Sequence, residues 1–126
     1  AQVASGGEFS RLMFSIKYVM AEKTSLPTLI LDEIDSGISG EIAIRLANRM
    51  KEMAKSHQLI CISHLPQIAS RAEGHFYVFK DNSAERTITN IKKLTQEERL
   101  NEIAQMIGGA SPSEKARQSA QEMLQS

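Results

Sequence analysis

Apolar residues follow two different spacings in the first half of the chain. Over residues 7–23 they recur about every three or four positions, which predicts a helix with one apolar face. Uninterrupted apolar runs at 28–32 and 58–63 are typical of short strands buried on both faces. A second helical pattern at 41–56 separates these runs. Strand, helix and strand in this order predict a βαβ unit with parallel pairing and a right-handed crossover.

The second half of the sequence predicts a different arrangement. A short helix is expected at 66–70, where a Pro opens the segment. Strand-like segments at 75–80 and 86–94 flank a polar turn, which predicts an antiparallel hairpin. A helical pattern at 96–107 stops at a Gly-Gly pair, a typical C-terminal signal. Residues 111–114 read Ser-Pro-Ser-Glu, which predicts a last helix that starts with a capping box and has Pro in its first turn.

The composition sets limits on the class of protein. At 126 residues we expect a single domain spanning 1–126. Lys plus Arg and Asp plus Glu are both 15, so the overall charge predicts neither nucleic-acid nor membrane binding. No apolar stretch approaches the roughly 18 residues of a membrane span. The single Cys61 lies in an apolar run, which favours a buried, unreactive thiol over a nucleophile and fits a reducing cytoplasm.

Two adjacent carboxylates, Asp32 and Glu33, stand at the C-terminal end of the first predicted strand. Neighbouring negative charges repel one another and are best tolerated beside a cation. In open α/β sheets ligands bind at this end of the strands, and Mg²⁺ held against nucleotide phosphates would meet the need. Asp32 would then hold Mg²⁺ through water, and Glu33 would polarise the attacking water or accept its proton. The alternative is a strand end with two solvated acids.

Two further segments have the residue types of a phosphate site. Ser5, Gly6 and Gly7 stand at a helix start, where free backbone N–H groups and the helix dipole favour an anion. His64 directly follows the second strand, next to Asp32 in a parallel pair, within reach of a terminal phosphate or the attacking water. Taken singly, each has an ordinary explanation: a capped helix start, and a strand-end His bonded to the backbone.

A Gly/Ser loop follows the acidic pair. Gly37 and Ser39 lie only a few residues beyond the expected metal site, so this loop could sense the nucleotide or cross to a partner subunit. A plain turn between the strand and the next helix explains Gly37 equally well.

The order of these segments is more specific than any one of them. The chain resembles the C-terminal half of an ABC-type ATPase head. Ala4-Ser5-Gly6-Gly7-Glu8 is similar to the signature motif, with Glu where transporters usually have Gln. Residues 28–33 resemble the Walker B strand, and His64 resembles the switch histidine. The loop at 36–39 occupies the place of the D-loop, with Ser39 where most family members carry Asp.

Other segments narrow the resemblance to an SMC-like family of bacterial DNA repair proteins. They are residues 32–40, 63–69, 99–104 and 107–109, and the likeness runs over 3–124. No G-x-x-x-x-G-K-[ST] loop occurs in the sequence, and the chain starts at a Gly-rich turn without Met. The resemblance therefore implies an α/β fold, the C-terminal lobe of an ABC/SMC-type P-loop ATPase head. It has mainly parallel strands with flanking helices, a terminal β-hairpin and two C-terminal helices, while the Walker A lobe and a coiled coil lie elsewhere.

The resemblance also implies a mechanism with ATP and Mg²⁺ between two heads. Ser5, Gly6 and Gly7, which we call the glycine turn, would together with Glu8 contact ATP held by the partner head. Asp32, Glu33 and His64 would act on ATP held by the chain's own N-terminal lobe. The implied partners are that lobe, the coiled coil, a second head in a homodimer and DNA, with no membrane. The implied role is ATP-dependent repair of DNA double-strand breaks and recombination in the bacterial cytoplasm, at the nucleoid. This chain alone is expected to hydrolyse no ATP.

Two other classes stay open at this point. One is the nucleotide-binding domain of another ABC ATPase, such as a transporter, which would need a membrane partner. The other is a non-catalytic interaction module that uses the hairpin and the C-terminal helices. It predicts that substitution of Asp32 and Glu33 leaves the biological activity untouched. A phosphate loop followed by long heptads upstream would favour the SMC-like class.

Overall fold

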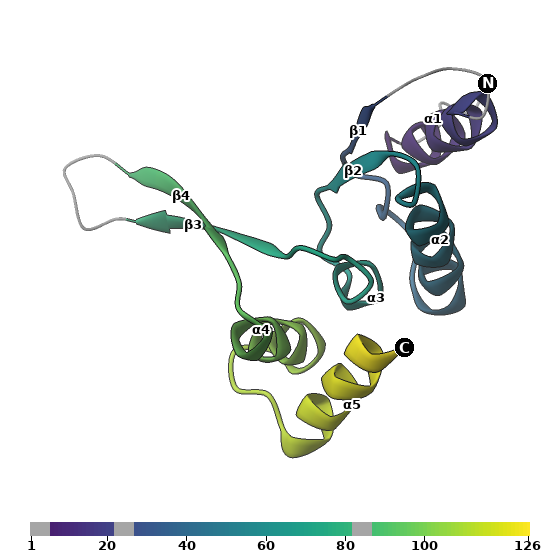
Figure 1. Cartoon of the computed structure of the whole chain (residues 1–126). Coiled ribbons are helices and arrows are strands. Elements are labelled where there is room, and N and C mark those ends of the chain that lie inside the picture. The colour runs from purple at the N-terminus through teal and green to yellow at the C-terminus, as the bar shows by residue number, and fades with distance from the viewer. Residues whose placement is uncertain (1–5, 22–26, 82–86) are drawn as a thin grey trace. The chain divides into compact units, whose positions relative to one another are not determined.

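The protein is described from a computed structural model, in which residues 6–21, 27–81 and 87–126 are described. The chain divides into two compact units, Ala1–Arg71 and Ala72–Ser126, each of which is described by itself. Figure 1 shows the helices and strands of each unit. That the two units act as one domain stays a prediction.

The first unit contains the predicted βαβ arrangement. Its elements are α1 (Gly6–Ala21), β1 (Thr28–Leu31), α2 (Gly40–Met53), β2 (Gln58–Cys61) and α3 (Pro66–Ala69). The two strands pair in parallel, as predicted, and α2 connects them (Figure 1). Both strands end one or two residues earlier than the sequence pattern indicates. The polar residues that follow each strand therefore belong to loops at the carboxyl edge of this sheet.

One face of the two-stranded sheet carries the core of the first unit. Leu29 and Leu31 are buried, whereas Ile30 and Ile60 on the other face are 62% and 46% exposed. The prediction of strands buried on both faces is therefore wrong for the part of the chain that the structure describes. An uninterrupted apolar run indicates that both faces of a strand can be buried. It does not show which element packs on each face. The buried members of the core come from helices, strands and loops alike: Phe14, Leu29, Leu31, Ile34, Ala47, Met50, Met53 and Ile68.

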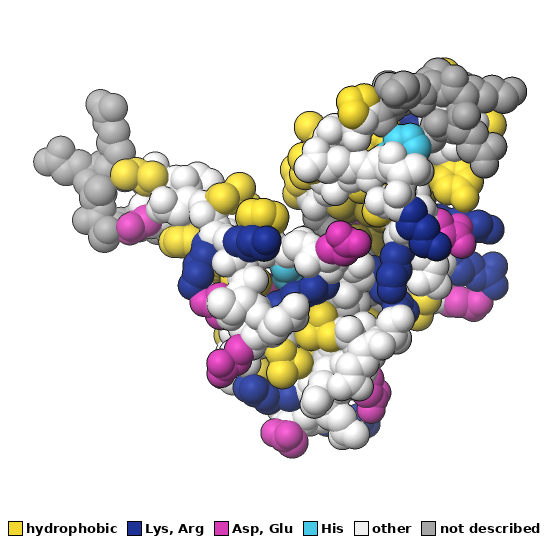
Figure 2. Space-filling view, viewed as in Figure 1, with side chains coloured by type: hydrophobic (Ala, Val, Ile, Leu, Met, Phe, Trp, Pro, Cys, Tyr) yellow, Lys and Arg dark blue, Asp and Glu magenta, His cyan; other side chains and the backbone are white. Residues whose placement is uncertain are grey.

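The second unit pairs a hairpin with two helices. Strands β3 (Phe76–Asp81) and β4 (Ile88–Lys93) are antiparallel, which confirms the predicted hairpin. The turn predicted between them falls mostly outside the described residues. All six residues of β3 are exposed, and hydrophobic side chains show on the hairpin surface in Figure 2. Helices α4 (Gln96–Gly108) and α5 (Glu114–Gln125) follow, and buried residues of both form the core of this unit.

Small residues set the close approach of α4 and α5. A Cβ on Gly108 would lie 3.0 Å from the Cβ of Ala116, so this helix end has little room for a side chain. Gly109 has φ 80°, and α4 stops there as predicted. Ser113 is the N-cap of α5, and its hydroxyl accepts a hydrogen bond from Ala116 N at 3.2 Å. Pro112 thus precedes the cap, so its predicted place in the first turn is wrong.

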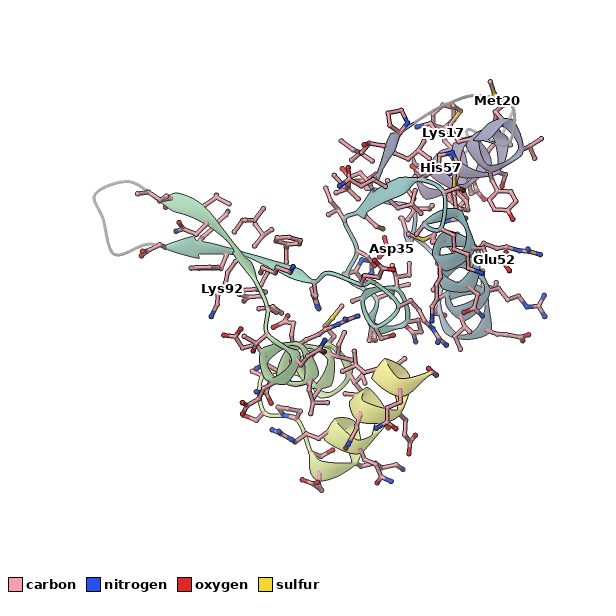
Figure 3. All side chains as sticks on the ribbon, viewed as in Figure 1. Lys17, Met20, Asp35, Glu52, His57 and Lys92 are labelled. Atoms are coloured by element: carbon pink, nitrogen blue, oxygen red, sulfur yellow. The ribbon has the colours of Figure 1, made fainter. Side chains whose placement is uncertain are left out.

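A capping box fixes the start of α4. Thr95 Oγ1 accepts from Glu98 N at 3.3 Å, and Thr95 N donates to Glu98 Oε2 at 2.9 Å. Lys92 of β4 donates to the same carboxylate, which joins the hairpin to α4; Figure 3 labels this lysine. The hydrogen bond from Lys92, followed by the one from the Thr95 backbone, lowers the pKa of Glu98 to about 2.

We expect Thr95→Ala to destabilise the first turn of α4, because the Glu98 backbone N–H loses its side-chain acceptor. The cost of removing such a cap is about 1 kcal/mol, which corresponds to a roughly fivefold larger open population. Hydrogen–deuterium exchange of the first α4 amides measures this directly. Thr95→Ser keeps the acceptor and serves as the control; equal exchange in both variants would contradict the capping role.

Candidate functional site

The loops that follow β1 and β2 meet at one edge of the sheet. Leu31 lies opposite Cys61, and Ile62 N donates to Leu31 O at 2.9 Å just beyond the ladder. The Asp32–Glu33 pair and His64 therefore follow neighbouring strand ends, as the sequence predicted. The side chains of all three residues are exposed. This is the edge of an α/β sheet at which ligands bind.

A buried carboxylate that the sequence argument did not single out joins the two loops. Asp35 is only 2% exposed. Its Oδ2 accepts from Ser63 Oγ at 2.6 Å and from His64 N at 3.0 Å, and it lies 3.2 Å from His64 Nδ1. Leu65 N donates to Ser63 Oγ at 3.1 Å, which extends the same network. Figure 3 labels Asp35 within the first unit. A further acid two residues after an acidic pair was the available sequence signal, but its burial could not be inferred.

Glu33 has an unusual backbone conformation. Its φ is 55°, and it is the only non-glycine residue in the described part of the chain with positive φ. This conformation costs about 1–2 kcal/mol for an L-residue. The next residue, Ile34, is fully buried, which contributes roughly 1.5–3 kcal/mol. The anchoring of Ile34 and Asp35 therefore outweighs the strain and turns the exposed Glu33 side chain away from the core.

The start of α1 contacts the loop after β1. A Cβ on Gly7 would lie 2.6 Å from both the Cβ and the O of Ser36, so only glycine fits here without displacement. Arg11, one turn further along α1, donates to the same Ser36 carbonyl. The glycine turn and the loop at the D-loop position thus lie side by side. Ser5, predicted as the helix cap, lies outside the described residues.

The remaining predicted loop residues lie at exposed positions. Gly37 has φ 72°, which favours glycine over other residues. Ser39 is the N-cap residue of α2, but its side chain makes no capping hydrogen bond. Glu8 lies in the first turn of α1 and is exposed. The predicted residues thus form two groups, the glycine turn with its loop and the acidic pair with His64, and residues 34–36 connect them.

Asp32, which the sequence predicts to hold Mg²⁺ through water, lies at the surface directly after β1. Its carboxylate is exposed and makes no hydrogen bond or ion pair with the described residues. It lines a hollow of about 130 Å³ between α1 and the end of β1, to which Lys17 also contributes. Across the described ranges, no group of three or more His, Cys, Asp or Glu residues could hold a metal.

Cys61 lies beneath this edge of the sheet. Burial, followed by the nearby charges of Asp35 and Asp32, raises the pKa of its thiol to about 12. The thiol therefore stays protonated at neutral pH, as expected of an unreactive cysteine.

Among the described helices, none is long and apolar enough to cross a membrane.

The sequence is similar to those of known DNA repair proteins. The chain is 39% identical over 124 residues to the DNA repair protein RecN of Halalkalibacterium halodurans. It is 40% identical to RecN of Vibrio cholerae and 41% identical to RecN of Deinococcus radiodurans, each over 124 residues. The chain resembles RecN. Each match covers 98% of this chain but 22% of the RecN protein. No protein-family model matches the chain.

Solved structures identify the fold that this RecN-like sequence adopts. An Smc head domain with a coiled coil and joint, derived from Pyrococcus yayanosii, superposes with a TM-score of 0.64 at 21% identity. It covers 80% of this chain and 19% of that one. A chain from work on ATP-driven dimerisation and DNA-stimulated activation of SMC ATPases gives a TM-score of 0.62 at 20% identity, covering 78% and 58%. The predicted fold, the α/β lobe of an SMC-type ATPase head, is confirmed.

We expect Gly7→Ala to destabilise the first unit. The added Cβ must displace either Ser36 or the start of α1, and overpacking of this kind costs about 1–3 kcal/mol, more than the roughly 1 kcal/mol that Ala gains in helix propensity. Urea unfolding measures the change. Ser15→Ala on the exposed side of α1 is the control. Equal stability of the two variants would show that the contact between Gly7 and Ser36 can accommodate a methyl group.

Cys61 should react slowly with thiol reagents in the folded protein. With its pKa raised from 9.0 to about 12, the thiolate fraction at pH 8 is roughly a thousandfold smaller than in the unfolded chain. Rates of iodoacetamide labelling in buffer and in 6 M guanidinium, followed by mass spectrometry, test this expectation. Cys61→Ser provides the blank because the chain has a single Cys. Similar rates in both solvents would contradict the shift.

Proposed function

We propose that this chain is the C-terminal lobe of an ATPase head in an SMC-like DNA repair protein. It spans 22% of the RecN proteins that it matches, so the activity belongs to the longer protein. The observation that carries the proposal is the edge of the β1–β2 sheet, where Asp32, Glu33 and His64 follow adjacent parallel strands. Similarity to RecN and the SMC head fold support the same conclusion.

At this edge each side chain has a role in hydrolysis of ATP. Glu33, exposed and turned outward by its left-handed backbone, acts as general base toward the attacking water. Asp32 would hold Mg²⁺ through water, and the ion would supply positive charge beside the phosphates. His64, also exposed, faces the terminal phosphate and the attacking water. The phosphate loop, which the sequence lacks, is supplied by the N-terminal lobe of the same protein.

The glycine turn acts on a second nucleotide. The N–H groups at the start of α1, together with the helix dipole, form an anion site for the γ-phosphate of ATP held by a partner head. The loop at 36–39 lies beside this turn through the contact of Gly7 with Ser36, so both face the same partner. ATP then bridges two heads, and hydrolysis removes the bridge. Coiled-coil arms convert this cycle into the holding of DNA ends during repair and recombination, at the nucleoid in the cytoplasm.

In the full-length protein, we expect Glu33→Gln to lower kcat for ATP by about 10²–10⁴, because the general base is lost while the shape of the side chain is kept. ATP affinity and ATP-dependent pairing of heads should be retained. Steady-state hydrolysis, binding of a fluorescent ATP analogue and light scattering measure the three properties. Glu73→Gln, at an exposed position of the second unit, is the matched control.

The result also separates the competing classes. Normal hydrolysis by Glu33→Gln would remove Glu33 as the base. Full DNA-repair activity in cells after substitution of both Asp32 and Glu33 would favour a non-catalytic interaction module. Turnover of ATP by this chain alone, well above background, would contradict the need for a separate phosphate-loop lobe.

A further inference from the structure

We infer that Asp35 is a positioning residue that acts through His64 in the proposed ATPase site. This inference rests on the proposed function for its catalytic consequence, but the geometry belongs to the chain itself. A single carboxylate oxygen of Asp35 receives the Ser63 hydroxyl at 2.6 Å and the His64 backbone N–H at 3.0 Å, and contacts the imidazole at 3.2 Å.

The burial of Asp35 makes this contact directional. The Asp35 side chain is 3% exposed, whereas the His64 side chain is 76% exposed. The imidazole therefore meets the Asp35 carboxylate at Nδ1, while most of the His64 side chain is open to solvent. A fixed negative charge beside one ring nitrogen favours the proton on that nitrogen. In the neutral form of the imidazole, this contact favours the Nδ1–H tautomer and leaves Nε2 as a hydrogen-bond acceptor.

Two hydrogen bonds, one from a side-chain hydroxyl and one from a backbone N–H, keep the Asp35 carboxylate in place. Ser63 Oγ, which itself accepts from Leu65 N at 3.1 Å, donates to Asp35, and the His64 N–H donates to the same oxygen. Asp35 is therefore immobilised by the loop that carries His64. Any displacement of the loop after β1 moves the imidazole with it. In the proposed mechanism, Nε2 accepts a hydrogen bond from the attacking water, and Asp35 sets its direction.

The test uses the full-length protein and four variants. Asp35→Asn keeps an oxygen that can accept from Ser63 and from the His64 backbone, but removes the charge. Glu73→Gln, which removes the charge of an exposed carboxylate in the second unit, is the control. His64→Gln and the double variant Asp35→Asn/His64→Gln complete a double-mutant cycle.

We expect Asp35→Asn to lower kcat roughly 10- to 100-fold, as is typical when the partner that orients an imidazole is removed, with ATP affinity changed by less than about twofold. Glu73→Gln should leave kcat unchanged. The double variant should be no slower than His64→Gln. Losses that multiply in the double variant, or an equal loss in Glu73→Gln, would overturn the inference, since the effect of Asp35→Asn would then not act through His64.

A second readout does not depend on ATP. ¹⁵N spectra of histidine-labelled full-length protein, assigned with His64→Gln, report which ring nitrogen carries the proton. The expected wild-type signal is that of an Nδ1–H tautomer, which Asp35→Asn should shift toward Nε2–H. An Nε2–H tautomer in the wild type, or an unchanged spectrum in the variant, would overturn the inference. If the full-length protein hydrolyses no ATP, the proposed function fails, while these spectra still decide the role of Asp35.

Discussion

One buried carboxylate oxygen connects the loops at the edge of the β1–β2 sheet. Asp35 belongs to the loop after β1, and its donors Ser63 and the His64 N–H belong to the segment after β2. A buried carboxylate is costly unless it is fully hydrogen-bonded, so these donors are what make its position tolerable. Because the same loop contacts the start of α1 through Ser36, the Asp35 network also influences where the glycine turn lies.

The loop after β1 combines strain with anchoring. Glu33 has a left-handed backbone, while Ile34 and Asp35 directly after it are almost completely buried. Strained residues persist only where the surroundings impose them, and they concentrate at functional sites. Here an exposed carboxylate is directed outward by the burial of its two successors. Burial of these two residues outweighs the strain, and it leaves the Glu33 carboxylate exposed for the role proposed for it.

The open faces of the two units agree with the proposal that this chain is one lobe of a larger ATPase head. Ile30 and Ile60 stay exposed on one face of the first sheet, and the hairpin of the second unit exposes Phe76, Val78 and Ile91. Two-stranded sheets are marginally stable by themselves and need a covering layer. The chain spans 22% of the RecN proteins that it matches. The rest of such a protein contains residues available to cover these exposed faces.

The sequence by itself determined the order of the elements, the parallel βαβ unit and the hairpin, because these follow from local periodicity and turn residues. It also placed Asp32, Glu33 and His64 at neighbouring strand ends, since parallel pairing leaves little alternative. Only the tertiary structure decided that Asp35 is buried and that one sheet face stays open. Asp35 and Ser63 are 28 residues apart. No local pattern encodes such a contact, because burial depends on neighbours that packing brings together from distant parts of the chain.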